Sequence, residues 1–313
     1  MSVKSTATLN WPLTQYAQGF MQDRLAAYRL ASLLMPIVKV GAASGTFKKF
    51  DDRNSFLVTD TYRGVGGTAK RLKFEATDGT YACEPHALEI PMDDFEPDLV
   101  GTGAGAAGAE LLAQGKIKSL LSVKATSYAK RAVDFAFASL TPVADRGNFS
   151  NESIDPIDQL DEQIDALATD VSSSENITLI LSLGVWRKIR MHPKVKARVQ
   201  GIKTALSRDQ FLDTLLLPVN LEISSVSATE TKWGQSTVNK GSLVGNYAIL
   251  LYSQPNPGLY DPSAFKCFST NDALVDGVRQ YREESARSEV YAVDWSEDMK
   301  LCSTLCARLL AIS

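Results

Sequence analysis

The chain has 313 residues, of which 44% are hydrophobic and 22% charged, with a formal net charge of −3 and a sequence pI near 5.6. This is enough apolar material for one large or two medium domains. The mildly acidic balance argues against a surface that grips nucleic acid by neutralising phosphates. No run of about 18 apolar residues is present, so we expect no transmembrane helix. The N-terminus lacks the apolar core of a signal peptide.

Four cysteines and two histidines limit the chemistry that the chain can carry. No cysteines form a C-x-x-C pair, which indicates reduced thiols, and Cys302 and Cys306 are expected to face inward on a helix. His86 and His192 are too few for a histidine-rich metal site, and neither lies beside a nucleophile motif. We expect both histidines at a helix end or on the surface. The sequence therefore predicts no catalytic residue, no metal site and no cofactor.

The most prominent predicted element is one long helix over residues 105–140. Its apolar or small residues recur every three or four positions and form one stripe: Ile117, Leu121, Ala125, Tyr128, Ala132 and Phe135. Lys118, Lys124 and Lys130 are expected off that stripe. A helix of about 28 residues is about 40 Å long, so we expect a structural spine rather than one wall of a compact core.

Residues 37–92 predict a long two-stranded hairpin with polar residues on both faces. Gly64, Gly66 and Gly67 mark its tip, and 78–79 (Asp-Gly) a second tight turn. Such a hairpin is marginal by itself in water. We therefore expect it to lie on a neighbouring copy of the chain; a mobile surface hairpin is the alternative.

A glycine run precedes the long helix and matches the dinucleotide-binding pattern G-x-G-x-x-G at Gly103, Gly105 and Gly108. That site also needs a buried apolar strand before it and an acidic residue ending a second strand about 20 residues later. The preceding stretch is acidic and contains Pro97, and the following stretch stays helical. We therefore interpret the glycines as a turn into the helix.

The other elements follow from apolar periodicity, caps and prolines. They are a helix over 13–34 ended by Pro36, a helix over 157–171 capped near Ser153 or Asp155, a buried strand 177–183, a basic helix 184–201 broken at Pro193, a helix over 207–216 capped by Ser207, strands 219–230, 246–254 and 263–270, a long hairpin 276–295 with its tip at 282–289, and an apolar strand or short helix 301–312. The basic charges of 184–201 could contact nucleic acid, although a solvated helix face is the preferred interpretation.

This order of elements resembles the major capsid proteins of tailed bacteriophages with the Hong Kong 97-type fold, over nearly the whole chain. Local likeness lies in VKVGAASGTFKKFD, in LSLGVWRKIRMHPKV, and in LLYSQPNPGLYDPSAFKCFS followed by VRQYREESARSEVYAVDW. The resemblance implies an α+β fold. Its parts would be an N-terminal arm (1–36), an extended two-stranded loop (37–92), a peripheral domain with the spine helix (93–144 and 271–298) and an axial domain (145–270 and 299–313).

The resemblance implies a major capsid protein that self-assembles into the icosahedral shell enclosing the viral double-stranded DNA genome. Such a protein is made in the host cytoplasm and resides in the virion. Its partners would be copies of itself in hexamers and pentamers, scaffolding and portal proteins, and packaged DNA through weak contacts, with no membrane. Scaffolding would come from a separate protein or a segment already removed, and no covalent cross-link is predicted. The proposed inter-subunit contacts are Phe47, Phe56, Arg63, Arg71, Phe74, Arg282, Glu283 and Arg287.

Two alternatives belong to other classes of protein. One is the shell of a bacterial encapsulin-type nanocompartment, which shares the fold but encloses enzymes. The other is a nucleotide-binding, nicotinamide-dependent enzyme, which rests on Gly103, Gly105 and Gly108 alone. The contents of purified particles would distinguish a nanocompartment shell from a viral capsid. Loss of a bound nucleotide on substituting Gly105 would support the enzyme.

Overall fold

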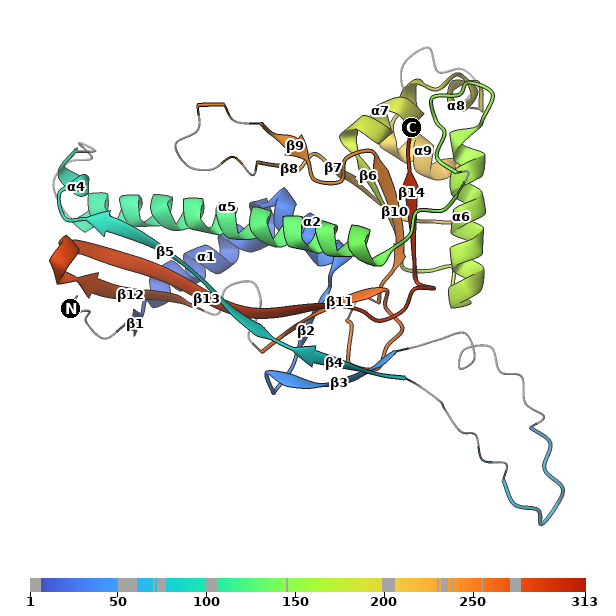
Figure 1. Cartoon of the computed structure of the whole chain (residues 1–313), viewed down its shortest axis with the longest axis horizontal. Coiled ribbons are helices and arrows are strands. Elements are labelled where there is room, and N and C mark those ends of the chain that lie inside the picture. Colours follow the sequence, from blue (N-terminus) through green and yellow to red (C-terminus); the bar gives the residue numbers. More distant parts are fainter. Residues whose placement is uncertain are drawn as a thin grey trace.

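The structure is a computed structural model that describes residues 7–49, 61–69, 71, 77–99, 106–144, 146–198, 206–229, 231, 236–237, 239–254, 256–270 and 277–313. It forms an elongated body with a lobe at one end, and residues 61–69 lie apart from the body, below the lobe (Figure 1). One six-stranded sheet lies in the body, in the order β1-β12-β13-β11-β2 with β5 also paired to β13. A four-stranded sheet, β14-β10-β6-β7, lies in the lobe.

The strands of the body sheet come from both ends of the chain. They are β1 (Thr8–Leu9), β2 (Ile37–Lys39), β5 (Glu84–Asp93), β11 (Phe265–Ser269), β12 (Val278–Glu283) and β13 (Ser288–Leu301). The predicted late hairpin is confirmed: β12 and β13 pair antiparallel and are joined by the 3-10 turn η1 (Glu284–Ala286). Arg287 closes that turn in the left-handed region, at φ 47°.

Strand β5 corrects the predicted hairpin over 37–92. Instead of returning along the loop, it pairs antiparallel with β13 over ten residues, from Glu84 opposite Glu297 to Asp93 opposite Ser288. Pro85 and Pro91 obscure this strand in the sequence because proline cannot donate to a ladder. They are tolerated since β5 is an edge strand, and the outward carbonyl of Pro91 accepts a hydrogen bond from Lys116 Nζ at 2.6 Å.

Helix α5 (Ala106–Ser139) is the predicted spine, with 34 residues and a length of about 51 Å. It runs along the body beside β5 and β13 (Figure 1). The predicted N-terminal helix is instead two helices, α1 (Trp11–Arg24) and α2 (Ala26–Leu34), because Leu25 between them takes an extended backbone. Both pack against α5 in the same hydrophobic core, so this segment packs on its own chain.

The predicted apolar stripe of α5 is buried, with Phe135 partly so. One neighbouring position differs from expectation: Lys124, predicted off the stripe, is only 3% exposed. Its ammonium lies 4.4 Å from the ring centroid of Trp295, a favourable cation–π arrangement. The cause is that α5 packs against α2 on one side and against β5 and β13 on another, so its buried face is wider than one stripe.

The base of the extended loop is a short hairpin of β3 (Ser44–Lys49) and β4 (Thr77–Ala82). The turn predicted at 78–79 is wrong, since both residues lie within β4 and Gly79 pairs with Phe47. This base has its own apolar support: the Phe47 and Tyr81 rings lie 5.1 and 4.7 Å from the ring of Phe268. The predicted tip is confirmed as a turn, where the Gly67 amide donates to the Gly64 carbonyl at 3.0 Å.

The lobe has its own hydrophobic core. Its strands are β6 (Ile177–Ser182), β7 (Asn220–Ser224), β10 (Tyr247–Tyr252) and β14 (Ala307–Ala311), and its helices are α6 (Pro156–Val171), α7 (Leu183–Met191), α8 (Pro193–Arg198) and α9 (Arg208–Asp213). Asp155 caps α6, and Ser207 forms a reciprocal capping box with Gln210 at α9. The C-terminal segment is a strand beside β10, as one of the two expected alternatives.

The cysteines are free thiols, and Cys302 and Cys306 are buried as expected, although they flank a turn rather than share a helix. Burial raises the pKa of the Cys302 thiol to about 12. His192 ends α7 but is buried rather than exposed, and His86 lies half-buried in β5. Among the described residues, no helix has the length and apolar content to span a membrane.

Candidate inter-subunit surfaces

Three of the proposed contact residues meet at the tip of the β12–β13 hairpin: Arg282, Glu283 and Arg287. The guanidinium of Arg282 donates to both carboxylate oxygens of Asp94, at 2.9 and 2.6 Å, and its Nε donates to Glu284 at 2.9 Å. The hydrogen-bonded guanidinium of Arg282 holds the pKa of Asp94 below its usual range. Arg282 therefore fastens the tip to the end of β5 within one chain, while Arg287 is exposed beside it.

The other proposed contacts lie on the extended loop. Arg63 and Arg71 are exposed, and every described residue of 61–69 is exposed too. Phe56 and Phe74 lie outside the described residues. Phe47 is 1% exposed and buried against Phe268 of its own chain, so it belongs to the base of the loop and not to a free surface.

Large exposed apolar side chains mark further surfaces that the sequence did not reveal. They are Trp11, Phe95, Leu99, Leu111 and Val123 on the body, Tyr62 and Val65 on the loop, Tyr260 in the 256–263 segment, and Leu183, Met191 and Leu216 on the lobe. In the sequence, an apolar residue inside a helical period reads as part of the core. Since isolated exposed apolar residues are normal, only those beside a second feature carry weight.

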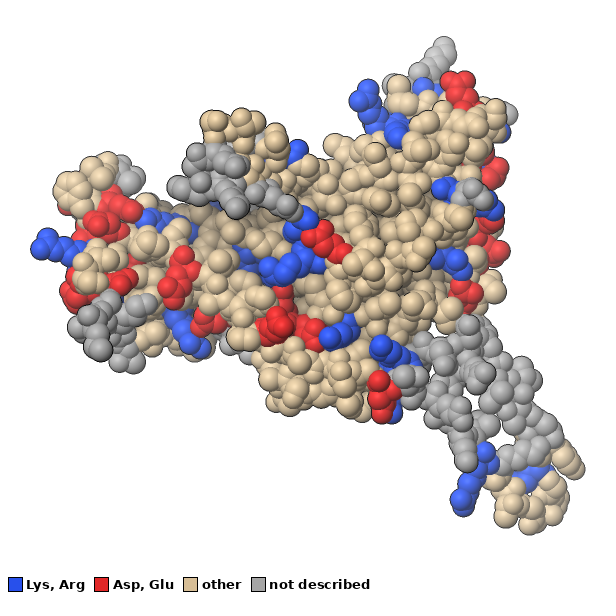
Figure 2. Space-filling view, in the orientation of Figure 1, with Lys and Arg blue, Asp and Glu red and all other residues tan. Residues whose placement is uncertain are grey.

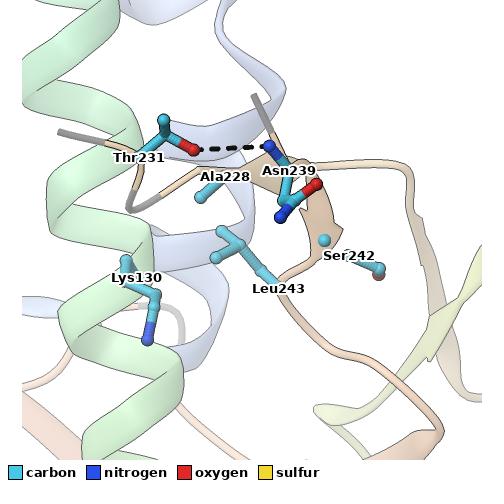
Figure 3. Close-up of a pocket in the computed structure, with 7 residues that line it drawn as sticks. Lys130, Ala228, Thr231, Asn239, Ser242 and Leu243 are labelled. Atoms are coloured by element: carbon cyan, nitrogen blue, oxygen red, sulfur yellow. Dashed lines mark hydrogen bonds between the residues drawn. The ribbon is translucent and has the colours of Figure 1, made fainter. Parts of the chain in front are cut away.

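A shallow groove of about 490 Å³ lies between α5 and the short hairpin of β8 (Ser227–Ala228) and β9 (Gly241–Ser242). Figure 3 shows Thr231, whose hydroxyl accepts from the Asn239 amide at 3.3 Å, above Lys130 of α5. The ammonium of Lys130 pairs at 2.5 Å with Asp134, one turn along the same helix. Besides Lys130, the described lining is hydroxyl, amide and aliphatic, and no nucleophile there lies beside a base.

A buried charge cluster joins α5 to β13. Glu297 accepts from Arg131 Nε at 2.7 Å and from the Trp295 indole at 3.1 Å, and its carboxylate lies 3.7 Å from His86 Nε2. The imidazole of His86 also stacks on the ring of Trp295. Both carboxylate oxygens of Glu297 accept hydrogen bonds within the chain, so the cluster positions α5 on the sheet.

The glycine run gives no described phosphate cradle. Gly103 and Gly105 lie outside the described residues, and Gly108 is inside the first turns of α5. Strand β5 ends at Asp93 and is followed by α4 (Glu96–Leu99). No group of three or more potential metal-ligating side chains occurs in the described part of the chain.

The geometry of the described residues is that of an elongated α+β chain with a long spine helix and a separate lobe. A phage-related protein from Bordetella bronchiseptica RB50 shares this architecture, with a TM-score of 0.72, 20% identity and 98% of each chain covered. The capsid structure of cyanophage P-SCSP1u has a TM-score of 0.51 at 10% identity, covering 90% of this chain and 86% of that chain. The capsid structure of Staphylococcus phage Andhra has a TM-score of 0.51 at 10% identity, covering 94% of this chain and 86% of that chain.

No family model and no curated protein sequence matches the chain. The solved structures therefore establish its fold: this chain has the fold of phage capsid proteins, as the resemblance in its sequence predicted.

Proposed function

We propose that this chain is a major capsid protein that self-assembles into the icosahedral shell enclosing a viral double-stranded DNA genome. The observation that carries the proposal is the likeness of its fold to two phage capsid structures over 90% and 94% of its length. On this reading the protein acts in the virion as a structural subunit, without enzymatic activity.

The distribution of surfaces supports this role. Exposed apolar or basic side chains occur on the loop (Tyr62, Arg63), the body (Phe95) and the lobe (Met191), so potential contacts are spread over the molecule. In a lattice, many modest contacts add up because each subunit is held at several points. The loop carrying Arg63 and Arg71 would lie across a neighbouring copy.

The proposed division into parts follows the resemblance. The body sheet with α5 would form the peripheral domain, and the lobe the axial domain whose edges meet around five-fold and six-fold axes. Scaffolding and portal proteins would act during assembly. Packaged DNA would make only weak contacts, because the chain carries a net charge of −3.

The test is electron microscopy of the purified full chain, expressed alone and with the neighbouring genes of its source. Shells, tubes or rings of hexamers support the proposal. A monodisperse monomer under every condition, at concentrations well above micromolar, contradicts it.

The encapsulin-type nanocompartment remains a second candidate because it shares the fold. The contents of purified particles decide between the two: packaged DNA or empty shells favour the virus, whereas a co-purifying cargo enzyme favours the nanocompartment. A nucleotide that co-purifies with the wild type and is lost in Gly105→Val would revive the enzyme interpretation.

A further inference from the structure

The lobe carries opposite charges on two of its flanks. Its helix α6 contains five acidic and no basic residues: Asp158, Asp161, Glu162, Asp165 and Asp170. Helix α7 contains three basic and no acidic residues: Arg187, Lys188 and Arg190. In Figure 2, acidic side chains follow the right-hand edge of the lobe, where α6 lies, with a few basic ones among them. Basic side chains gather on the opposite side, where α7 lies.

Ion pairs within the chain neutralise only part of the acidic flank. Glu162 pairs with Arg146 at 2.7 Å, Asp158 with Arg198, and Asp170 with Arg308. These three pairs leave two carboxylates of α6 without an ion pair to a described residue.

The remaining carboxylates are Asp161 and Asp165, one turn apart. Asp161 accepts a hydrogen bond from the Leu216 amide at 2.9 Å, and Asp165 is exposed with no ion pair to another described residue. On α7, likewise, Arg187, Lys188 and Arg190 make no ion pair with any residue in the described ranges. Each flank therefore keeps a net charge, of opposite sign.

Each flank also exposes apolar side chains beside its charges. Leu183, Arg187 and Met191 follow one another at four-residue spacing on the outer face of α7, and Leu183 and Met191 are 56% and 55% exposed. Leu216, whose amide donates the hydrogen bond to Asp161, has a side chain that is 59% exposed. Charge with adjacent apolar area is the composition of a specific protein interface rather than of a merely solvated face.

We infer that the α7 flank of one copy docks on the α6 flank of the next copy, with Arg187 facing Asp165 and Leu183 and Met191 packing near Leu216. The two flanks differ, so the contact is head-to-tail, and repeating it generates a ring when the rotation closes. This assignment rests on the proposed function, because it supplies the lateral contact within a ring of subunits.

The experiment reverses each charge separately and then mixes the two variants. In Asp165→Lys and in Arg187→Glu, every head-to-tail contact places like charges together, so the concentration for half-assembly should rise about tenfold. In a one-to-one mixture, an alternating ring again places opposite charges together at every contact. The mixture should therefore recover ring formation, and only rings with an even number of subunits can alternate.

The readout is sedimentation and negative-stain microscopy of the full chain. Glu175→Lys is the matched control for Asp165→Lys, since it makes the same charge reversal on the same lobe beyond the C-terminus of α6. Circular dichroism confirms that the surface variants fold. Recovery in the mixture as hexamers without closed shells supports the inference, because a closed icosahedral shell needs pentamers.

Two results overturn the inference in distinguishable ways. If the wild type forms shells and the single variants assemble as well as it does, or the mixture is no better than either variant, the flanks are not partners while the proposed function stands. If the wild type stays a monomer under every condition, with no shells, tubes or rings, the proposed function fails and the inference falls with it.

Discussion

Arg282 and Asp94 form a two-pronged ion pair, with guanidinium nitrogens 2.9 and 2.6 Å from the two carboxylate oxygens, across 188 positions of sequence. The pair holds the tip of the β12–β13 hairpin against the segment that leaves β5. The Asp94 amide adds a hydrogen bond to the Arg287 carbonyl at 3.1 Å. An ion pair and a backbone hydrogen bond thus hold these two segments together.

The first prediction is that acid loosens this end of the body. Arg282 lowers the pKa of Asp94, so the pair contributes stability above the ordinary aspartate pKa of about 3.9 and loses it as pH falls through the lower folded value. Exchange of the Asp94 amide hydrogen, corrected for intrinsic rate, should therefore accelerate below about pH 4. In Asp94→Asn, protection of this amide from exchange should be weaker at neutral pH, and it should not change as pH falls below about 4. An unchanged pH profile in the variant would contradict the assignment.

The second prediction concerns the buried carboxylate of Glu297. In Glu297→Gln, Arg131 keeps its charge but loses its ionic partner; because its side chain is 38% exposed, water solvates it in part, and the free energy of unfolding should fall by about 2 kcal/mol. The matched control is Asp134→Asn, which removes the partner of the adjacent Lys130 on the helix surface and should cost at most about 0.5 kcal/mol. Urea denaturation of the dissociated subunit measures both. Equal effects would mean that the cluster does not depend on its burial.

The third prediction tests the junction between the spine helix and the lobe. Gly147 has φ +94°, and a Cβ atom there would lie 2.1 Å from the Ala311 carbonyl oxygen. Gly147→Ala should therefore destabilise the lobe by at least about 2 kcal/mol, because backbone must move. Gly115→Ala, where nothing lies within 4 Å, should instead stabilise helix α5 by about 0.5–1 kcal/mol. Thermal unfolding distinguishes the two, and a neutral Gly147→Ala would refute the close approach.

The fourth prediction addresses the stripe of α5. The Tyr128 hydroxyl donates to the Met35 carbonyl at 3.3 Å and its ring stacks on Tyr28, so Tyr128→Phe should cost about 1 kcal/mol. Tyr128→Asp places a charge in the core and should abolish folding. Val123→Asp, on the exposed face of the same helix, should leave the free energy of unfolding within about 0.5 kcal/mol of the wild type. A folded Tyr128→Asp variant that still assembles would show that the stripe is misplaced.

Local signals predicted most of the helices and lobe strands. The period of α5, the capping residues Asp155 and Ser207, and the apolar run of β6 each act within a few residues, so they are readable without the fold. The late hairpin was also predicted because its strands are adjacent in sequence.

Long-range pairing accounts for what the sequence did not reveal. In the sequence, strand β5 resembles part of a loop because its partner β13 lies about two hundred residues later. Lys124 reads as a surface residue because only the packed sheet brings Trp295 to it. Among the candidate contacts, Arg282, Glu283 and Arg287 lie at the tip of the late hairpin, and their role between subunits stays a prediction. The sequence could not show that Arg282 already has a partner in its own chain or that Phe47 is buried.

Strand β5 has one more consequence through Pro85 and Pro91. Both lack the N–H that an incoming strand would need along this edge of the body sheet. The Pro91 carbonyl is also occupied by Lys116. When many copies of a protein are close together, exposed sheet edges can pair between copies and form fibres. The two prolines interrupt the row of donors that such pairing needs, so contacts along this edge depend more on side chains, which can be specific and reversible.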